Sequence, residues 1–295
     1  MSSVAVHCLP SGAADARRLA ARLGLPVQGI TIHQFPDGEI KVTVSDAAPT
    51  SIIYASLDRP NDKLIALLFA AEALRRGGAK RLVLLAPYLC YMRQDAAFHP
   101  GEAISQQAIG RLLTATFDRV ITVDAHLHRT SDIRMVFPGI EADNLSAMPA
   151  IAEALAGIDP ATVVAGPDEE SRPWVSALAA LLGLGHVVGR KTRRGDRSVE
   201  IDFAGQIAMA GRPILLVDDI VSSGGTLMTC AQTLRAAGAV TIDAVITHAL
   251  FPPDMIEEFA RAGIRSIRST SSVAHPTNAI PLDRVLADAL QGELA

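Results

Sequence analysis

Short apolar runs alternate with amphipathic stretches along almost the whole chain. The apolar runs predict short buried strands, and most stretches between them have the apolar spacing of helices. Such alternation is typical of parallel sheets with helices on both faces, so we expect an α/β fold with parallel-rich sheets. The predicted strands are residues 3–9, 40–45, 51–56, 81–86, 119–123, 162–165, 185–188, 214–217, 242–247 and 264–269. The predicted helices are residues 14–23, 62–75, 105–115, 150–155, 172–182, 226–236 and 254–261.

Two segments of the chain resemble each other. Leu74–Ala79 (LRRGGA) matches Leu234–Ala239 (LRAAGA), and in each a predicted helix ends in glycine before an apolar strand. Extended backwards without a gap, the match places Leu57-Asp58 on Val217-Asp218. Any two β-α-β units share features of this kind, so chance likeness and a duplicated domain remain as alternatives. Duplication predicts one domain over residues 1–146 and another over 147–295, with a last helix near Leu282–Leu290 packing on the first domain.

Composition excludes several classes of protein. The net charge of -4 and the 4% aromatic content do not favour a nucleic-acid surface. The three cysteines, Cys8, Cys90 and Cys230, are too scattered for a disulfide framework or a zinc knuckle. Met1–Pro10 has no basic and apolar signal regions, and no apolar run has the length of a membrane span. We therefore expect a cytoplasmic protein without nucleic-acid or membrane partners.

The segment Leu215–Thr226 (LLVDDIVSSGGT) carries the strongest chemical signal. An apolar strand is followed by Asp218 and Asp219, then by a loop of small residues and the start of a helix. Ligands of open α/β sheets bind at this carboxyl edge, and glycines at a helix start let backbone N–H groups approach an anion. The pattern predicts a phosphorylated sugar, with its hydroxyls on the two acids and its phosphate on the loop Ser222, Ser223, Gly224, Gly225 and Thr226. A merely capped helix would explain the glycines but not the paired acids.

This segment resembles the phosphoribosyl-binding loop of type I phosphoribosyltransferases. Five further motifs occur in the order typical of the ribose-phosphate pyrophosphokinase family, and the likeness runs from about Phe35 to Pro281. These motifs are Phe35–Glu39 (FPDGE), Arg93–Asp95 (RQD), Val123–His126 (VDAH), Gly166–Asp168 (GPD) and Arg190–Arg193 (RKTR). The resemblance implies two duplicated phosphoribosyltransferase-like domains, and an enzyme that transfers the diphosphoryl group of ATP to ribose 5-phosphate with Mg²⁺.

The resemblance also implies roles for individual residues. It assigns Lys191 and Arg193 to a mobile catalytic loop, where two cations neutralise the transferring phosphoryl group. It assigns His126 and Asp168 to Mg²⁺. Those expected to bind ATP are Phe35, Asp37, Glu39, Arg93, Gln94 and Asp95. In the family, the loop that carries Phe35 reaches the active site of a neighbouring subunit, so a homodimer or a larger homo-oligomer is expected.

Alternative interpretations remain for the individual motifs. A turn such as Pro36–Gly38 is common on surfaces, and a basic run such as Lys191–Arg197 is usually a solvated loop. His126 and His128 form a His-x-His pair, but no cysteine or glutamate accompanies them at zinc spacing. For the whole chain, the alternatives are a phosphoribosyltransferase of nucleotide salvage and a non-catalytic paralogue that regulates a true synthetase.

The chain departs from the family pattern at three places. Ser222 stands where many members have an acid, and Glu170-Ser171 stands where many have two glycines. The segment Ala96–Ser105 lacks the basic residues of the ADP-regulated bacterial form, and resembles the shorter archaeal type. The serine leaves the details of sugar binding open.

Overall fold

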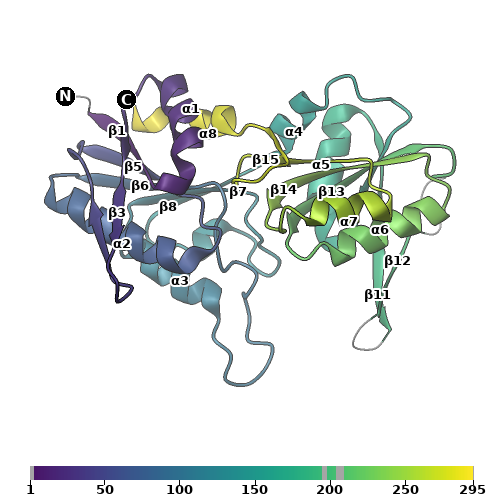
Figure 1. Cartoon of the computed structure of the whole chain (residues 1–295), viewed down its shortest axis with the longest axis horizontal. Helices are drawn as coiled ribbons and strands as arrows, with labels where there is room; N and C mark the ends of the chain where they lie inside the picture. The colour runs from purple at the N-terminus through teal and green to yellow at the C-terminus, as the bar shows by residue number, and fades with distance from the viewer. Residues whose placement is uncertain (1–2, 195–197, 204–208, 295) are drawn as a thin grey trace. The chain divides into compact units, whose positions relative to one another are not determined.

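The computed structural model describes residues 3–194, 198–203 and 209–294, with the backbone alone between 191 and 200. Its contacts divide the chain into two compact units. Unit 1 comprises Met1–Ser146 and Asp283–Ala295, and unit 2 comprises Ala147–Leu282. The last helix of the chain therefore belongs to unit 1, and we describe each unit by itself (Figure 1).

Unit 1 is built on a six-stranded parallel sheet in the order β2-β1-β5-β6-β7-β8. The strands are β1 Val4–Cys8, β2 Val27–Gly29, β5 Thr50–Tyr54, β6 Arg81–Ala86, β7 Arg119–Val123 and β8 Glu141–Leu145. A separate antiparallel hairpin consists of β3 Thr31–Gln34 and β4 Ile40–Thr43. The helices are α1 Ala13–Leu23, α2 Pro60–Arg76, α3 Ser105–Thr114 and α8 Asp283–Ala289, with short 3-10 turns at Pro10–Gly12, Ile133–Met135 and Gln291–Glu293.

Unit 2 has a second six-stranded parallel sheet, in the order β10-β9-β13-β14-β15-β16. The strands are β9 Val163–Gly166, β10 Gly185–Val188, β13 Pro213–Val221, β14 Thr241–Ala249, β15 Ser266–Thr270 and β16 Asn278–Ile280. The antiparallel hairpin of this unit consists of β11 Arg190–Arg194 and β12 Ser198–Asp202. The helices are α4 Met148–Ala154, α5 Arg172–Leu182, α6 Gly225–Ala236 and α7 Met255–Ala262, with a 3-10 turn at Glu169–Ser171.

The two units share one topology, which confirms the prediction of duplicated domains. In each sheet the first strand of the unit lies second and the later strands follow in chain order. Each unit also inserts its hairpin between the second and third strands of its sheet. Both α1 and α5 end in a left-handed glycine, Gly24 and Gly183, where an L side chain would be strained. The resemblance between Leu74–Ala79 and Leu234–Ala239 therefore reflects a duplication.

The predicted α/β class is confirmed, and its physical basis is burial of apolar runs. The strands β6, β7, β9 and β13 are buried along most of their length, as expected of strands covered on both faces. The prediction missed β2, β3, β8, β11, β12 and β16. All three cysteines are buried free thiols. Among the described residues, none of the helices combines the length and apolar character needed to cross a bilayer.

Candidate active site

The acids Asp218 and Asp219 lie inside β13. The prediction ended this strand at Val217, which is wrong because β13 continues to Val221. The strand continues because it still pairs with β14, Ile220 with His248 and Val221 with Ala249. In addition, Asp218 Oδ1 accepts from Asp219 N at 3.1 Å, and Asp219 Oδ1 accepts from Ile220 N at 2.8 Å. Asp219 is buried, with 5% of its surface exposed. The pair is therefore held rigidly by the sheet itself.

Negative charge is concentrated at this edge of unit 2. Burial raises the pKa of Asp218 well above its ordinary value, and the charges of Asp219 and Asp168 raise it further. These three carboxylates come from neighbouring strand ends, since β9 and β13 pair directly through Ala165 and Leu216. Crowded carboxylates are stabilised by a cation or by hydroxyl donors.

The loop after β13 leads into the N-terminus of α6. Gly224 has φ 73° and precedes the first residue of the helix, Gly225. A Cβ on Gly224 would lie only 2.5 Å from Cε1 of Phe259, so the fold itself demands glycine here. Ser223 and Gly225 are exposed, and Ser222 and Thr226 are partly exposed. The first turn of α6 therefore presents N–H groups and hydroxyls where an anion is favoured.

Asp168 lies after β9 and begins a 3-10 turn. Its side chain accepts a hydrogen bond from the backbone N–H of Glu170 at 3.2 Å, and its carbonyl accepts one from Ser171 Oγ at 2.6 Å. Gly166 makes room for this turn, because a Cβ there would lie 2.0 Å from Ser171 Oγ. Asp168 is thus fixed beside the acids of β13.

The predicted catalytic residues Lys191 and Arg193 lie on β11. Their backbones pair with Ile201 and Val199 of β12, and Ile201 is buried in the core of unit 2. The side chains of both cations fall outside the described part of the structure. The hairpin begins beside the acid-rich edge, since Gly189 N donates to Gly166 O at 2.9 Å.

In unit 1, His126 follows β7 on a loop of unusual conformation. Asp124 has φ 39°, a left-handed value that is uncommon for a residue with a side chain, and it is buried. The backbone N–H of Ala125 donates to Asn144 Oδ1 at 2.8 Å, and Asp124 N donates to Leu145 O at 2.8 Å. Both acceptors lie on β8, so β8 holds the strained loop in place. The sequence prediction missed Asn144, which lies one residue before the end of β8, the strand that pairs with β7.

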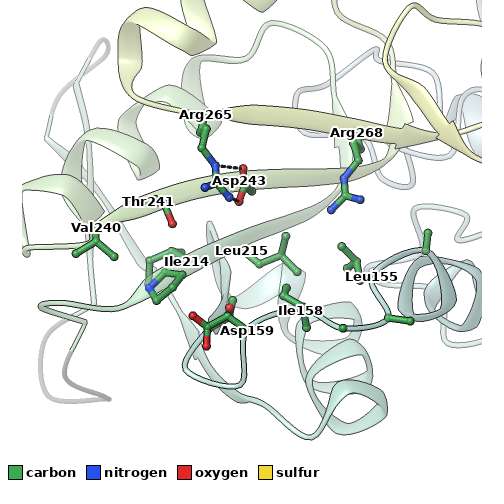
Figure 2. A pocket seen from close by; sticks show the side chains of 15 residues that line it. Leu155, Ile158, Asp159, Ile214, Leu215, Val240, Thr241, Asp243, Arg265 and Arg268 are labelled. Carbon is green, nitrogen blue, oxygen red and sulfur yellow. Dashed lines mark hydrogen bonds and ion pairs between the residues drawn. The ribbon is translucent and has the colours of Figure 1, made fainter.

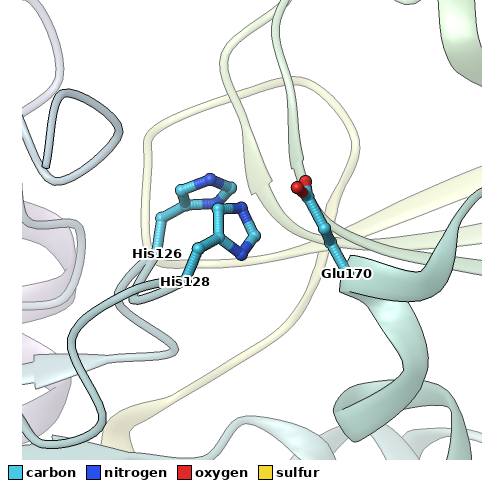
Figure 3. A group of neighbouring side chains, drawn as sticks. All are labelled: His126, His128 and Glu170. Atoms are coloured by element: carbon cyan, nitrogen blue, oxygen red, sulfur yellow. The ribbon is translucent and has the colours of Figure 1, made fainter. Parts of the chain in front are cut away.

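The imidazoles of His126 and His128 lie against each other. Their ring centroids are 3.8 Å apart at an interplanar angle of 79°, an edge-to-face arrangement (Figure 3). Glu170, which Figure 3 also draws, belongs to unit 2 and is part of the turn at Asp168. The contact gives His128 a structural connection to the predicted metal ligand His126.

The motif Arg93–Asp95 has two kinds of environment. Arg93 is exposed, and within the described residues it makes no ion pair. Asp95 has a buried side chain that accepts from Arg129 Nη1 at 2.7 Å and from Arg129 N at 3.2 Å. Gln94 Nε2 donates to Ala96 O at 3.1 Å. Arg93 is therefore the member of this motif available to a ligand, whereas Asp95 fixes the segment that carries it.

The predicted nucleotide loop Phe35–Glu39 is the tip of the hairpin β3–β4. The tip is closed by Phe35 N donating to Glu39 O at 2.8 Å and by Glu39 N donating to Asp37 Oδ1 at 3.1 Å. Phe35 is 40% exposed and packs edge-to-face on His33 at 4.8 Å. Between the hairpin and α2 lies a pocket of about 520 Å³ whose lining includes Ile32, Ile65 and Phe69, all large exposed apolar side chains.

Comparison with known proteins supports one family. Residues 7–116 match the N-terminal domain of ribose phosphate pyrophosphokinase, and residues 142–263 match the phosphoribosyl transferase domain. A ribose-phosphate pyrophosphokinase of Methanopyrus kandleri is 32% identical over 281 residues, which cover 93% of this chain and 94% of the relative. Ribose-phosphate pyrophosphokinase 2 of Archaeoglobus fulgidus is 34% identical over 279 residues, which cover 95% of this chain and 97% of the relative.

A solved structure shows the same fold. The crystal structure of phosphoribosylpyrophosphate synthetase from Mycobacterium smegmatis superposes with a TM-score of 0.85 and covers 98% of each chain at 24% sequence identity.

Proposed function

The chain belongs to the ribose-phosphate pyrophosphokinase family, and on this premise we propose that it transfers the diphosphoryl group of ATP to the C1 hydroxyl of ribose 5-phosphate. The products are phosphoribosyl pyrophosphate and AMP. The observation that carries the proposal is the edge of unit 2, where Asp218 and Asp219 lie beside the loop that begins α6.

The sugar phosphate fits this edge by its two ends. The 5-phosphate accepts hydrogen bonds from N–H groups and hydroxyls of Ser222, Ser223, Gly224, Gly225 and Thr226, where the partial positive charge of α6 favours an anion. The ribose hydroxyls donate to the carboxylates of Asp218 and Asp219, which are too close together to receive a second phosphate without repulsion. The C1 hydroxyl oxygen then attacks the β-phosphorus and loses its proton, the bond from the β-phosphorus to the oxygen of the α-phosphate breaks, and AMP leaves without a covalent enzyme intermediate.

The acids of this edge also suit Mg²⁺. Oxygen ligands are those that Mg²⁺ prefers, and the raised pKa of Asp218, caused by burial and the charges of Asp219 and Asp168, marks a place where a cation is stabilising. We assign Asp168, fixed beside these acids, to this ion, and the family resemblance also assigns His126 to Mg²⁺. Mg²⁺ supplies neutralisation of the phosphate oxygens, and Lys191 and Arg193 of β11 add positive charge where the transition state gains negative charge.

ATP is assigned to residues of unit 1. The exposed guanidinium of Arg93 is free to stack on the adenine or pair with phosphate, and Gln94 and Asp95 shape the segment that presents it. Phe35, Asp37 and Glu39 stand on an exposed hairpin tip that meets its nucleotide in a second copy of the chain. The exposed apolar side chains Ile32, Ile65 and Phe69 beside this hairpin support a homo-oligomer of at least two chains.

A coupled assay tests the proposal. Purified protein with ATP, ribose 5-phosphate and Mg²⁺ should release AMP in an amount equal to the phosphoribosyl pyrophosphate formed, and omission of any one of the three should stop the release. A phosphoribosyltransferase would instead consume phosphoribosyl pyrophosphate only when a nucleobase is added. A non-catalytic paralogue would give no product from any of these mixtures, and that result would overturn the proposal.

A further inference from the structure

A pocket of about 510 Å³ opens at the amino ends of β13, β14 and β15 in unit 2, at the opposite edge of the sheet from Asp218 and Asp219 (Figure 2). The segment Leu155–Asp159, which follows α4, forms one wall. The pocket takes no part in the proposed reaction. Comparison with the equivalent place in unit 1 explains why unit 2 has a pocket here.

The wall segment has a counterpart in unit 1. Residues 152–158 read AEALAGI and residues 287–293 read ADALQGE, so four of the seven align as identical without a gap. The first heptapeptide ends α4, which packs on α5, and the second ends α8, which packs on α1. Because α1 and α5 are equivalent helices, Ile158 of unit 2 stands where Glu293 stands in unit 1.

In unit 1 this place is filled by an ion cluster. The side chain of Glu293 is only 4% exposed, and it accepts hydrogen bonds from Arg81 at 2.7 and 2.8 Å and from Arg119 at 2.9 Å. The sequence match and strand pairing identify the equivalents in unit 2. The ungapped match of Leu74–Ala79 with Leu234–Ala239 places Arg81 on Thr241 and Val83 on Asp243. Arg119 pairs with Val83 as Ser266 pairs with Asp243. The positions of the glutamate and the two arginines in unit 1 are thus occupied in unit 2 by isoleucine, threonine and serine. These side chains are smaller, and the space that they do not fill is the pocket.

A cation nevertheless points into this pocket. Arg268 lies on the same face of the sheet as Asp243, and its guanidinium is directed toward Leu215 and Leu155 (Figure 2). Among the described residues it has no ion-pair or hydrogen-bond partner. Its charge acts on the carboxylate of Asp243, with which Arg265 at the rim is paired through two nitrogens. Arg268 is partly buried, so an anion that reaches it displaces little water and forms a strong pair.

We propose that this pocket binds a small organic carboxylate with an apolar body. The carboxylate pairs with Arg268 as Glu293 pairs with Arg81, and the body lies on Leu155, Ile158 and Leu215. The acids Asp159 and Asp243 also line the pocket, so repulsion grows with each negative charge of the ligand and disfavours a polyphosphate more than a monoanion. The pocket is therefore distinct in chemistry from the proposed nucleotide and sugar-phosphate sites.

Methyl NMR of the full chain tests this proposal without an activity assay, so its outcome is independent of the proposed function. Benzoate is titrated against protein labelled at isoleucine and leucine methyl groups, with neutral benzamide as the matched probe and phenyl phosphate as the phosphate counterpart. The methyl signals of Ile158, Leu155 and Leu215 should shift with benzoate until they saturate. The affinity for benzamide should be at least about ten-fold lower than for benzoate, and the affinity for dianionic phenyl phosphate should also be lower than for benzoate.

Substitution locates the site. Arg268→Gln should weaken benzoate binding about ten-fold or more, and Arg261→Gln on the exposed face of α7 should leave it unchanged. Methyl signals elsewhere in Arg268→Gln should keep their positions, which shows that the variant is folded. Equal affinity for benzoate and benzamide, unchanged binding in Arg268→Gln, or shifts without saturation would each overturn the proposal. Tighter binding of phenyl phosphate than of benzoate would overturn its assignment to carboxylates.

Discussion

Glu293 is bound by the guanidinium of Arg81 through two hydrogen bonds of 2.7 and 2.8 Å, across 212 positions of the chain. Arg119 donates a third hydrogen bond, so one buried carboxylate joins the end of the chain to the first residues of β6 and β7. Ion pairs of this kind stabilise little on their own account, but removing one partner leaves buried charge unpaired. The end of the chain is therefore part of unit 1 through a specific contact.

Glu293→Gln should destabilise unit 1 by about 1.5–3 kcal/mol, because two arginines lose a charged acceptor. Hydrogen exchange followed by mass spectrometry should show faster exchange in α8 and at the start of β6. Glu72→Gln is the matched control, since Glu72 pairs with Arg76 on the exposed surface of α2 and should change stability by less than about 1 kcal/mol. Equal protection of α8 in the wild type and Glu293→Gln would contradict the assigned role.

The same carboxylate makes unit 1 sensitive to acid. Burial by itself would raise the pKa of Glu293, but the hydrogen bonds from Arg81 and Arg119 outweigh this and hold the pKa below its ordinary value of 4.5. The unfolded chain therefore takes up a proton at a higher pH than the folded chain does. The stabilisation by the ionised Glu293 is complete above about pH 4.5, and it is lost as the pH falls through the lower pKa that Glu293 has in the folded chain. Urea titrations should show that the stability difference between wild type and Glu293→Gln shrinks over that range.

His7 gives a second, separate dependence on pH. It lies fully buried in β1, and neither ring nitrogen has a hydrogen-bond partner among the residues that the structure describes. Burial lowers the pKa of His7 from 6.5 to about 4. Between these pH values His7 is protonated in the unfolded chain but not in the folded chain. The free energy of unfolding therefore falls as the pH drops from about 6.5 to about 4, by about 3 kcal/mol in total.

His7→Leu should remove this dependence, and should be at least as stable as the wild type at pH 7.5 because an unsatisfied buried polar group is gone. The measurement is the free energy of unfolding from urea titrations at pH 7.5 and 4.5. Thr122→Val serves as control, since Thr122 also has a buried oxygen without a partner among the described residues but does not titrate. A loss of stability with acid that is the same in the wild type and His7→Leu would show that other groups cause it.

Much of the fold could be predicted because its strands are apolar runs between helices with regular spacing. The bounds of β6, β7, β10 and α5 were predicted to the residue, since turn residues or charges flank them. The strand β8 was missed because its sequence, EADNL, is mostly polar and it lies at the edge of the sheet. The short β2 and β16 are also edge strands, and three residues are too few to show the alternating pattern of a strand.

The candidate site was predictable where a local motif carries the chemistry. The loop Ser222–Thr226 and the acids before it could be proposed from the sequence because they are neighbours in the chain, on the end of β13 and the start of α6. Asn144 and Arg129 could not, because each acts on a residue distant in sequence: Asn144 on Ala125, and Arg129 on Asp95. Contacts of this type depend on which strands are neighbours, and a single sequence does not specify that.

Asn144 is expected to act as a positioning residue for His126. Asn144→Ala removes the acceptor for Ala125 N and frees a loop that is strained at Asp124, so the Mg²⁺ concentration for half-maximal rate should rise about five- to ten-fold. Asn144→Asp keeps an acceptor oxygen and should restore most of this loss. A general folding defect would instead lower the amount of active protein without changing the Mg²⁺ dependence, and that result would exclude a positioning role.

Asp219→Ala and the control Arg212→Ala, near opposite ends of β13, together test the sugar site. Asp219 should lose a charge-assisted hydrogen bond to a ribose hydroxyl, which raises the KM for ribose 5-phosphate about ten- to a hundred-fold. The Arg212 side chain donates to Ala161 O at 2.7 Å, at the other end of β13, so Arg212→Ala should leave this KM within about two-fold. Steady-state rates with varied ribose 5-phosphate decide the matter, and equal effects of the two changes would undo the assignment.

Lys191 is the residue on which the proposed mechanism depends most. Its backbone pairs with Ile201, whose side chain is buried in the core, so the base of the hairpin is anchored while β11 extends from the acid-rich edge. We expect the Lys191 ammonium to meet charge that develops on the transferring phosphoryl oxygens and to contribute little to ground-state binding. Removing an interaction made mainly in the transition state lowers kcat and leaves KM nearly unchanged.

Lys191→Ala should therefore lower kcat by about a hundred- to a thousand-fold and change the KM values for ATP and ribose 5-phosphate only a few-fold. Arg194→Ala, on the same strand, is the control, because a loop that merely attracts anions would use both cations alike. Equal losses in the two variants would reduce β11 to an electrostatic attractor. Turnover of Lys191→Ala near the wild-type rate would remove Lys191 from catalysis, and the transition-state charge would then have to be met by Arg193 and Mg²⁺ alone.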